Sequence, residues 1–438
     1  MEKNEIKQKL FDAIDSMAED IKAYADDIAK HAELGWFENR TSDRFAEELT
    51  KFGLKAQRGL AVTGVRADIK SDKQGPNVAV LGELDGIICR AHPDADPESG
   101  ATHQCGHNLQ TSMALLVAGA FAKTGLMKEL SGSLSIFGVP AEEFIDITRR
   151  KQLHDEGKIV FFSGKPELIR RGAFDDVDMA MMVHSGGPVP ERTITIPDSG
   201  NGFRIFMLQI KGVQAHAAAA PHDGINALHA AIAGINAVNA LRETFRDEDH
   251  VRVHYIITKG GDSANCIPDD VRLEGYVRAV DAKTMDVVFE KVMKAFKSAA
   301  ESIGAECFVT SIPGEMPLNP SLEMNKLFAE NSRAIVGDNM VTEHTVFAAS
   351  TDMGDIMQIM PAIHGFTGGT VGTLHSAEFH VVDFEAAVLV PAKAMASTIV
   401  DLLAGDAGTA KEIISAFKPV YTKEEYLAAM NARFYSEI

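Results

Sequence analysis

The chain has 438 residues, 45% of them hydrophobic and 24% charged, and its formal net charge is −19. A chain of this length is too long for one hydrophobic core and indicates two or three domains. The acidic charge argues against nucleic acid and anionic membranes as partners, because both attract basic surfaces.

The first 35 residues are charged and have the periodicity of helices. Their apolar residues recur every three or four positions: Ile6, Leu10, Ile14, Met17, Ile21 and Tyr24. This segment lacks the uninterrupted apolar core of a signal peptide, and we expect no membrane-spanning run in the chain. Four sparse, widely spaced cysteines argue against a secreted disulfide scaffold. We therefore expect a cytoplasmic protein.

Three strand-like segments then end on polar residues. They cover 77–86, 132–143 and 177–187. The polar residues at their ends are Asp85, the pair Glu142 and Glu143, and His184. A helical pattern over 109–123 separates the first two, which is the alternation of an α/β sheet. Ligands bind outside the carboxyl ends of strands in such sheets, so these side chains are placed to share one site.

The pattern changes after about residue 195. Strand-like segments cover 203–212, 251–258, 271–280 and 306–311, and helical ones cover 224–245 and 282–302. Their order, strand-helix-strand-strand-helix-strand, is typical of a ferredoxin-like module. We interpret 311–321 as the linker that leaves this module, and a long helix is predicted over 383–403. The expected architecture is an α/β catalytic domain (1–195 and 314–438) interrupted by an inserted α+β domain (196–313).

The segment "THQCGHNLQTS" (102–112) holds two histidines and a cysteine within five residues. Cysteine, histidine and carboxylate side chains are the ligands of zinc-like metals. Each candidate also has an ordinary structural explanation. A strand-end histidine is usually hydrogen-bonded, two glutamates after a proline suit a helix start, and a buried cysteine is a small hydrophobe. Their common position in turns and at strand ends favours a metal site.

Seven motifs follow one another along nearly the whole chain. They are "HAELGWFENRTSD" (31–43), Cys-Gly-His (105–107), Pro-Ala-Glu-Glu (140–143) with His-Ser-Gly (184–186), "KGVQAHAAAAPHDGINAL" (211–228), "GGDSANCIPDDVRLEGYVR" (260–278) and "GTLHSAEF" (372–379). In these motifs the sequence resembles the co-catalytic metallopeptidases of the aminoacylase and carboxypeptidase G clan. It is most similar to the branch of hippurate, auxin-conjugate and aminobenzoyl-glutamate hydrolases (peptidase family twenty, subfamily D).

The resemblance implies a zinc-exopeptidase-like catalytic domain, with a mixed sheet flanked by helices, and an inserted lid or dimerisation domain. It implies two divalent metal ions per subunit (Zn, Mn, Co or Ni). The ligands implied are Cys105, His107, Glu143, His184 and His375, with Cys105 as a bridging thiolate. Glu142 would be the general base that takes a proton from a metal-activated water.

Four further residues take roles around this centre. We interpret Asp85 as a carboxylate that orients a ligand histidine, although an ordinary turn aspartate before Gly86 is an alternative. By resemblance, His216 polarises the scissile carbonyl, often across a dimer interface. Asn265 and Arg278 match the pair that binds the terminal carboxylate of the substrate. A turn histidine and an exposed sheet arginine are the alternatives for His216 and Arg278.

Three positions depart from the usual pattern of the branch. Asn108 replaces a common aspartate, Val139 replaces a frequent glutamine, and the loop 86–104 is polar and unusual. Asn108 and the long segment 144–178 are more similar to the aminobenzoyl-glutamate and dipeptide hydrolases, so we expect an N-acyl amino acid or dipeptide-like substrate with a free carboxylate. Two alternatives stay open: a hydrolase with Cys105 as nucleophile, and a non-catalytic relative that binds a ligand.

Overall fold

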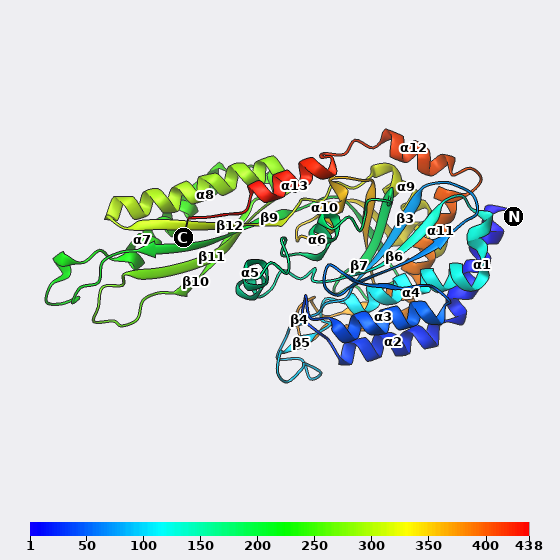
Figure 1. Cartoon of the computed structure of the whole chain (residues 1–438), viewed down its shortest axis with the longest axis horizontal. Coiled ribbons are helices and arrows are strands. Elements are labelled where there is room, and N and C mark those ends of the chain that lie inside the picture. The colour runs from blue at the N-terminus through cyan, green and yellow to red at the C-terminus, as the bar shows by residue number, and fades with distance from the viewer. Residues whose placement is uncertain (438) are drawn as a thin grey trace. The chain divides into compact units, whose positions relative to one another are not determined.

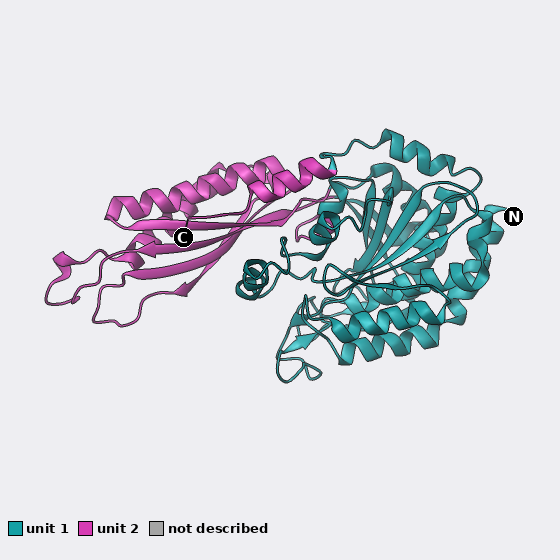
Figure 2. Ribbon diagram, in the orientation of Figure 1, with its two compact units in different colours: residues 1–198, 319–346, 355–422 teal, residues 199–318, 347–354, 423–438 magenta. Residues whose placement is uncertain are grey.

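The computed structural model describes residues 1–437, which divide into two compact units (Figure 2). Unit 1 comprises residues 1–198, 319–346 and 355–422. Unit 2 comprises residues 199–318, 347–354 and those from 423 onward. The chain thus leaves unit 1 once for a long insertion and returns to unit 2 twice more.

Unit 1 is built on an eight-stranded mixed sheet in the order β1-β2-β6-β3-β7-β14-β8-β13 (Figure 1). These strands are Gln57–Leu60 (β1), Gly64–Lys70 (β2), Asn77–Glu83 (β3), Ser133–Val139 (β6), Met179–Ser185 (β7), Ile194–Gly200 (β8), Val341–Phe347 (β13) and Ala362–Thr367 (β14). β6, β3, β7 and β14 run parallel, whereas β2 pairs antiparallel with β6, and β8 pairs antiparallel with β14. The carboxyl ends of β6, β3 and β7 therefore meet at one edge, as the sequence predicted.

Helices flank this sheet, which confirms the predicted α/β class. They are Lys3–Ser16 (α1), Ala18–Lys30 (α2), Asn39–Lys51 (α3), His107–Thr124 (α4), Ile147–Asp155 (α5), Gly164–Arg170 (α6), Leu322–Val336 (α9), Val390–Leu403 (α11) and Gly408–Ala416 (α12). α4 packs on β3 and contacts α1, α2 and α11, so almost all its side chains are buried. Short pieces complete the unit: β4 (Ile87–Ile88), β5 (Ala101–Thr102), β15 (Thr370–Val371), β16 (His380–Val381), η1 (Leu126–Glu129) and η5 (Asp338–Met340).

Unit 2 is an α+β module with the sheet order β10-β11-β9-β12-β17. Its strands are Gly202–Lys211 (β9), Arg252–Lys259 (β10), Asp270–Ala279 (β11), Glu306–Glu315 (β12) and Tyr435–Ser436 (β17). Its helices are Ala227–Leu241 (α7), Ala282–Ile303 (α8) and Lys423–Ala432 (α13), with 3-10 turns Pro221–Asp223 (η2), Arg242–Thr244 (η3) and Asp247–Asp249 (η4). The order β9-α7-β10-β11-α8-β12 is the predicted ferredoxin-like one. α8 begins where Asp281 caps the amide of Thr284 and ends at the left-handed Gly304.

Two details of the predicted boundaries differ from the structure. The segment interpreted as a linker from residue 311 begins inside β12, because Pro313 falls at an irregularity in its pairing with β9, where the missing amide is tolerated. The last residues of the chain, assigned to the catalytic domain, lie in unit 2. There β17 pairs with β12, and Arg433 forms an ion pair with Asp286 of α8 at 2.8 Å.

The predicted long helix at 383–403 has two parts. A π-helical turn, Glu385–Leu389 (η6), precedes α11, whose Pro391 lacks the amide needed for a regular ladder. The stretch Glu385–Leu403 is long and apolar enough to cross a membrane, contrary to the expectation from the sequence. It is 89% buried in the protein, as is usual for a core helix of a globular unit. α10 (Met353–Met357) connects segments of the two units.

Candidate metal centre

The candidate site of unit 1 lies where β3, β6 and β7 end. Asp85 follows β3, the Glu142–Glu143 pair follows β6, and His184 lies on β7 itself. Cys105 immediately precedes Gly106, the residue before the first turn of α4, and His107 opens that helix. Gly106 adopts a left-handed backbone (φ 85°), and a Cβ there would lie 2.9 Å from Ser185 Oγ. This turn thus requires glycine between the two candidate ligands.

The structure brings all five predicted metal ligands together in two groups. The first consists of Cys105, His107 and His184, and the second of Cys105, Glu143 and His375. Cys105 Sγ lies 3.4 Å from His184 Nε2 and 3.2 Å from His375 Nε2. His375 Nε2 lies 3.1 Å from Glu143 Oε1. Because Cys105 belongs to both groups, its sulfur is the one donor placed to bridge two ions.

These distances fit divalent metal ions. Two donors that share an ion lie about 3.0–3.6 Å apart when bonds of about 2.0–2.3 Å meet at right to tetrahedral angles. The Cys105–His184, Cys105–His375 and Glu143–His375 separations all fall in this range. In addition, His107 Nε2 and Glu143 Oε1 are buried without a hydrogen-bond partner in the described structure. Buried polar atoms are normally satisfied, so a bound cation is the fitting partner.

The protonation behaviour of the free ligands points in the same direction. Burial, and then the charge of Glu143, raises the pKa of the Cys105 thiol well above its usual value. Although burial opposes it, Cys105 and Glu83 raise the pKa of His107. The nearby Glu143 carboxylate, 3.1 Å away, raises the pKa of His375. A buried neutral thiol is a poor nucleophile, whereas metal coordination would deprotonate it outright.

Asp85 lies against two parts of the centre at once. Its Oδ1 is 3.2 Å from His107 Nδ1, which also lies 2.8 Å from the Asp85 carbonyl oxygen. Its Oδ2 accepts a hydrogen bond from the Glu143 amide at 2.9 Å. With Nδ1 held in this way, His107 presents Nε2 to the donor group.

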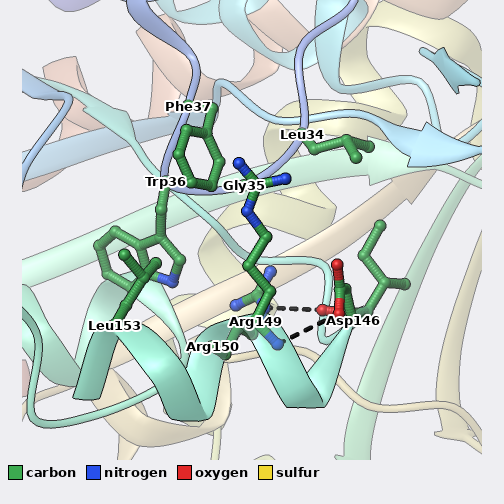
Figure 3. A pocket seen from close by; sticks show the side chains of 9 residues that line it. Leu34, Gly35, Trp36, Phe37, Asp146, Arg149, Arg150 and Leu153 are labelled. Atoms are coloured by element: carbon green, nitrogen blue, oxygen red, sulfur yellow. Dashed lines mark hydrogen bonds between the residues drawn. The ribbon is translucent and has the colours of Figure 1, made fainter. Parts of the chain in front are cut away.

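Glu142 and Glu143 lie in a turn that the buried Arg150 stabilises through hydrogen bonds to the backbone. Its guanidinium donates to the carbonyl oxygens of Ala141 (3.1 Å), Ile145 (2.9 Å), Glu143 and Phe162. Figure 3 shows Arg150 in a pocket lined by Trp36, Phe37, Arg149 and neighbouring residues. Arg150 lies outside all the sequence motifs described above.

Two more residues at the centre were missed. Glu83, the last residue of β3, and Lys165, on α6, are both fully buried and form an ion pair at 2.6 Å. Glu83 also groups with His107 and Glu142 as a possible metal-binding set. Glu83 could have been identified from the sequence, because it ends a mostly apolar strand and a glutamate is rarely buried without a partner.

The side chain of Asn108, which follows His107, contacts helix α2. Its side-chain amide donates to the Ala25 carbonyl oxygen of α2 at 3.2 Å. An ionised aspartate could not donate this hydrogen bond, so the amide serves the contact between α4 and α2.

The remaining candidate residues lie in unit 2. His216 forms a bridge pair with Cys266, and the Ala217 amide donates to the Asn265 carbonyl oxygen at 3.0 Å, so His216 and Asn265 occupy adjoining loops. Arg278 on β11 donates to Ser350 Oγ at 2.7 Å and lies 3.1 Å from His254 Nε2. Its guanidinium also lies over the ring of Phe203.

The chain is similar to known peptidases and hydrolases along most of its length. Residues 201–303 match the peptidase dimerisation domain. The chain is 28% identical over 421 residues to Xaa-Arg dipeptidase from Mus musculus, covering 91% of this chain and 89% of that protein. It is 27% identical over 495 aligned positions to one of the subunits of p-aminobenzoyl-glutamate hydrolase from Escherichia coli (strain K12), covering 96% of this chain and 97% of that protein.

The fold is that of solved M20 peptidases. A dinuclear metal-binding peptidase of the M20 family from Bacillus subtilis superposes with a TM-score of 0.69 at 21% identity, over 89% of this chain and 99% of that one. The predicted resemblance is therefore confirmed, both in the inserted domain and across the length of the chain. This protein is a metal-dependent hydrolase, and along most of its length it is similar to peptidases and amidohydrolases of the M20 family.

Proposed function

We propose that this hydrolase cleaves the amide bond of an N-acyl amino acid or dipeptide-like substrate with a free carboxylate, of the aminobenzoyl-glutamate type. One observation carries the chemistry: Glu142 lies beside two metal-binding groups that share the Cys105 sulfur. The names of two relatives, a dipeptidase and an aminobenzoyl-glutamate hydrolase, support the substrate class.

In this proposal Glu142 and Glu143 have different tasks. Glu142 Oε2 lies 3.8 Å from His107 Nε2, beyond the spacing of adjacent donors on one ion, whereas Glu143 Oε1 is within that range of His375. Glu143 would hold a metal ion, and Glu142 would take the proton of the attacking water and deliver it to the leaving amine. When bound, two divalent ions supply water activation and polarisation of the carbonyl.

The substrate contacts of unit 2 are part of the proposal. His216 would donate to the oxygen of the scissile carbonyl, and Asn265 and Arg278 would bind the terminal carboxylate. Partial burial of Arg278 supports this role, because a desolvated guanidinium binds a carboxylate more strongly than an exposed one.

We also propose a homodimer that forms through unit 2, in the cytoplasm. β10 is an edge strand of the unit 2 sheet, and its Ile256 and Ile257 side chains are 59% and 43% exposed. Exposed edge strands with apolar residues pair readily with another chain. The match to a peptidase dimerisation domain over 201–303 supports this surface.

Two matched variants test the catalytic roles. Glu142→Gln should abolish turnover of aminobenzoyl-glutamate, N-acyl amino acids and dipeptides while both metal ions are retained. Glu143→Gln should lose metal, measured by elemental analysis after dialysis. The opposite pattern would show that the two glutamates are interchanged. A metal-loaded wild-type protein that cleaves nothing in the panel would instead support the non-catalytic alternative.

A cysteine-nucleophile hydrolase is the second candidate, because Cys105 Sγ contacts the Nε2 atoms of two histidines. The raised pKa of the thiol opposes it. Activity that survives exhaustive treatment with EDTA would favour this mechanism, and loss of activity that Mn²⁺ or Zn²⁺ restores would eliminate it.

A further inference from the structure

Glu83 presents one carboxylate oxygen to the metal centre and keeps the other for a buried cation. Lys165 Nζ donates to its Oε1 at 2.6 Å, and both side chains are fully buried. Its Oε2 lies 3.1 Å from His107 Nε2. Glu83 Oε2 and His107 Nε2 are both buried, and neither forms a hydrogen bond among the described residues, although the two atoms are within contact distance of each other. Two unsatisfied atoms therefore converge on one point.

A buried ion pair alone does not account for this arrangement. Lys165 satisfies Oε1, and Oε2 would pair with a protonated His107, but Oε2 forms no hydrogen bond among the described residues, and an unsatisfied buried acceptor is costly. The 3.1 Å between Oε2 and His107 Nε2 matches the spacing of about 3.0–3.4 Å for oxygen and nitrogen donors on one divalent ion. By contrast, Glu142 Oε2 is 3.8 Å and Glu143 Oε1 4.0 Å from the same nitrogen.

We propose that Glu83 is a sixth protein ligand, which binds through Oε2 the ion held by His107, while Lys165 fixes the carboxylate through Oε1. This rests on the proposed metal-dependent function. Glu83 and His107 belong to one group of possible donors, whereas Glu143 and His375 belong to another. Glu83 would therefore add an oxygen donor to the ion at His107 and none to the ion at Glu143 and His375. The two sites consequently differ in donor set, and they should differ in affinity.

The first test measures metal binding without any reaction. Wild-type protein and Glu83→Gln are stripped and titrated with Zn²⁺ and with Mn²⁺ against a competing chelator. Glu83→Gln should weaken one of the two ions by about 100-fold and leave the other within about threefold. The matched control is Glu167→Gln, which alters another buried, ion-paired carboxylate near Lys165 in the chain, and it should leave both affinities unchanged. If folded Glu83→Gln binds both ions with the affinities of the wild-type protein, the proposal is overturned.

The second test does not depend on that variant folding. A crystal structure of metal-loaded wild-type protein should place Glu83 Oε2 about 2.0–2.4 Å from one ion. A separation above about 3 Å would overturn the assignment of Glu83 and leave the proposed function intact. Wild-type protein that binds no divalent ion at all would instead refute the proposed function itself.

Discussion

Arg150 offers a direct test of how the chain positions Glu142 and Glu143. The side chain is 3% exposed, and its guanidinium donates to four backbone carbonyl oxygens, those of Ala141, Glu143, Ile145 and Phe162. Ala141 adopts a left-handed backbone (φ 51°), so the turn needs support from outside. Arg150→Met removes every one of these donors while it keeps an apolar stem of similar length.

The expected cost follows from the carbonyl groups that are left behind. Each buried acceptor that loses its donor costs about 1–3 kcal/mol, and part of this is recovered because a buried cation is also removed. We therefore expect Arg150→Met to lower the free energy of unfolding by about 3–5 kcal/mol, a large fraction of a typical total of about 5–15 kcal/mol. The turn should also lose its geometry, so kcat should fall by about 100-fold.

The neighbouring arginine provides the control. Arg149 is exposed, and its guanidinium lies 3.8 Å from the centre of the Phe37 ring. An exposed cation–π contact contributes about 0.5–1 kcal/mol, so Arg149→Met should cost no more than that. Urea unfolding of the two variants in the metal-free state measures the difference. The reasoning is refuted if Arg150→Met is within about 1 kcal/mol of Arg149→Met, which is the size of one hydrogen bond.

Three further predictions concern other parts of the molecule. Arg278→Ala should chiefly raise KM for substrates with a free carboxylate, and an equal rise for their esters would contradict the carboxylate role. Ile256→Arg, at a 59% exposed site on the edge strand β10, should convert a dimer into monomers in light scattering without a change in thermal stability; a persistent dimer would place the interface elsewhere. Burial, and then the charge of Asp85, raises the pKa of Glu38 to about 7. The unfolded value is about 4.3, so this carboxyl lowers the stability of metal-free protein as pH rises from about 4.3 to 7, by up to about 4 kcal/mol. Glu38→Gln should remove that loss when urea unfolding near pH 5 is compared with pH 8, and an unchanged pH dependence would show that Glu38 is not the cause.

Much of the centre could be predicted because its residues follow strands directly. Polar residues after β3, β6 and β7 converge wherever parallel strands end together, and the motifs supplied His107 and His375. Lys165 and Arg150, which hold residues of the centre in place, could not be predicted from their position next to a strand. Lys165 is 82 positions from Glu83, and only the packing of α6 brings them within 2.6 Å. Arg150 acts on backbone carbonyls, which leave no mark in the sequence.

Asn108 illustrates a different limit of the sequence. Asparagine in place of a common aspartate next to His107 removes one negative charge from the sequence beside this ligand. In the structure its amide donates to the Ala25 carbonyl oxygen of α2, so the side chain serves helix packing. The orientation of a side chain at a helix start depends on what packs against it, and Ala25 lies 83 positions earlier in the chain.

The charges at the centre show why metal binding should depend steeply on pH. Cys105, Glu83, Asp85, Glu142 and Glu143 are five acidic groups at or against the donor atoms, and Lys165 is the buried cation paired with Glu83. Fully ionised, these six groups sum to −4, which two divalent ions balance. Without ions, protons take their place, since the pKa values of Cys105 and His107 are raised. Metal binding must therefore release protons from the thiol and the imidazole, so that metal affinity rises with pH.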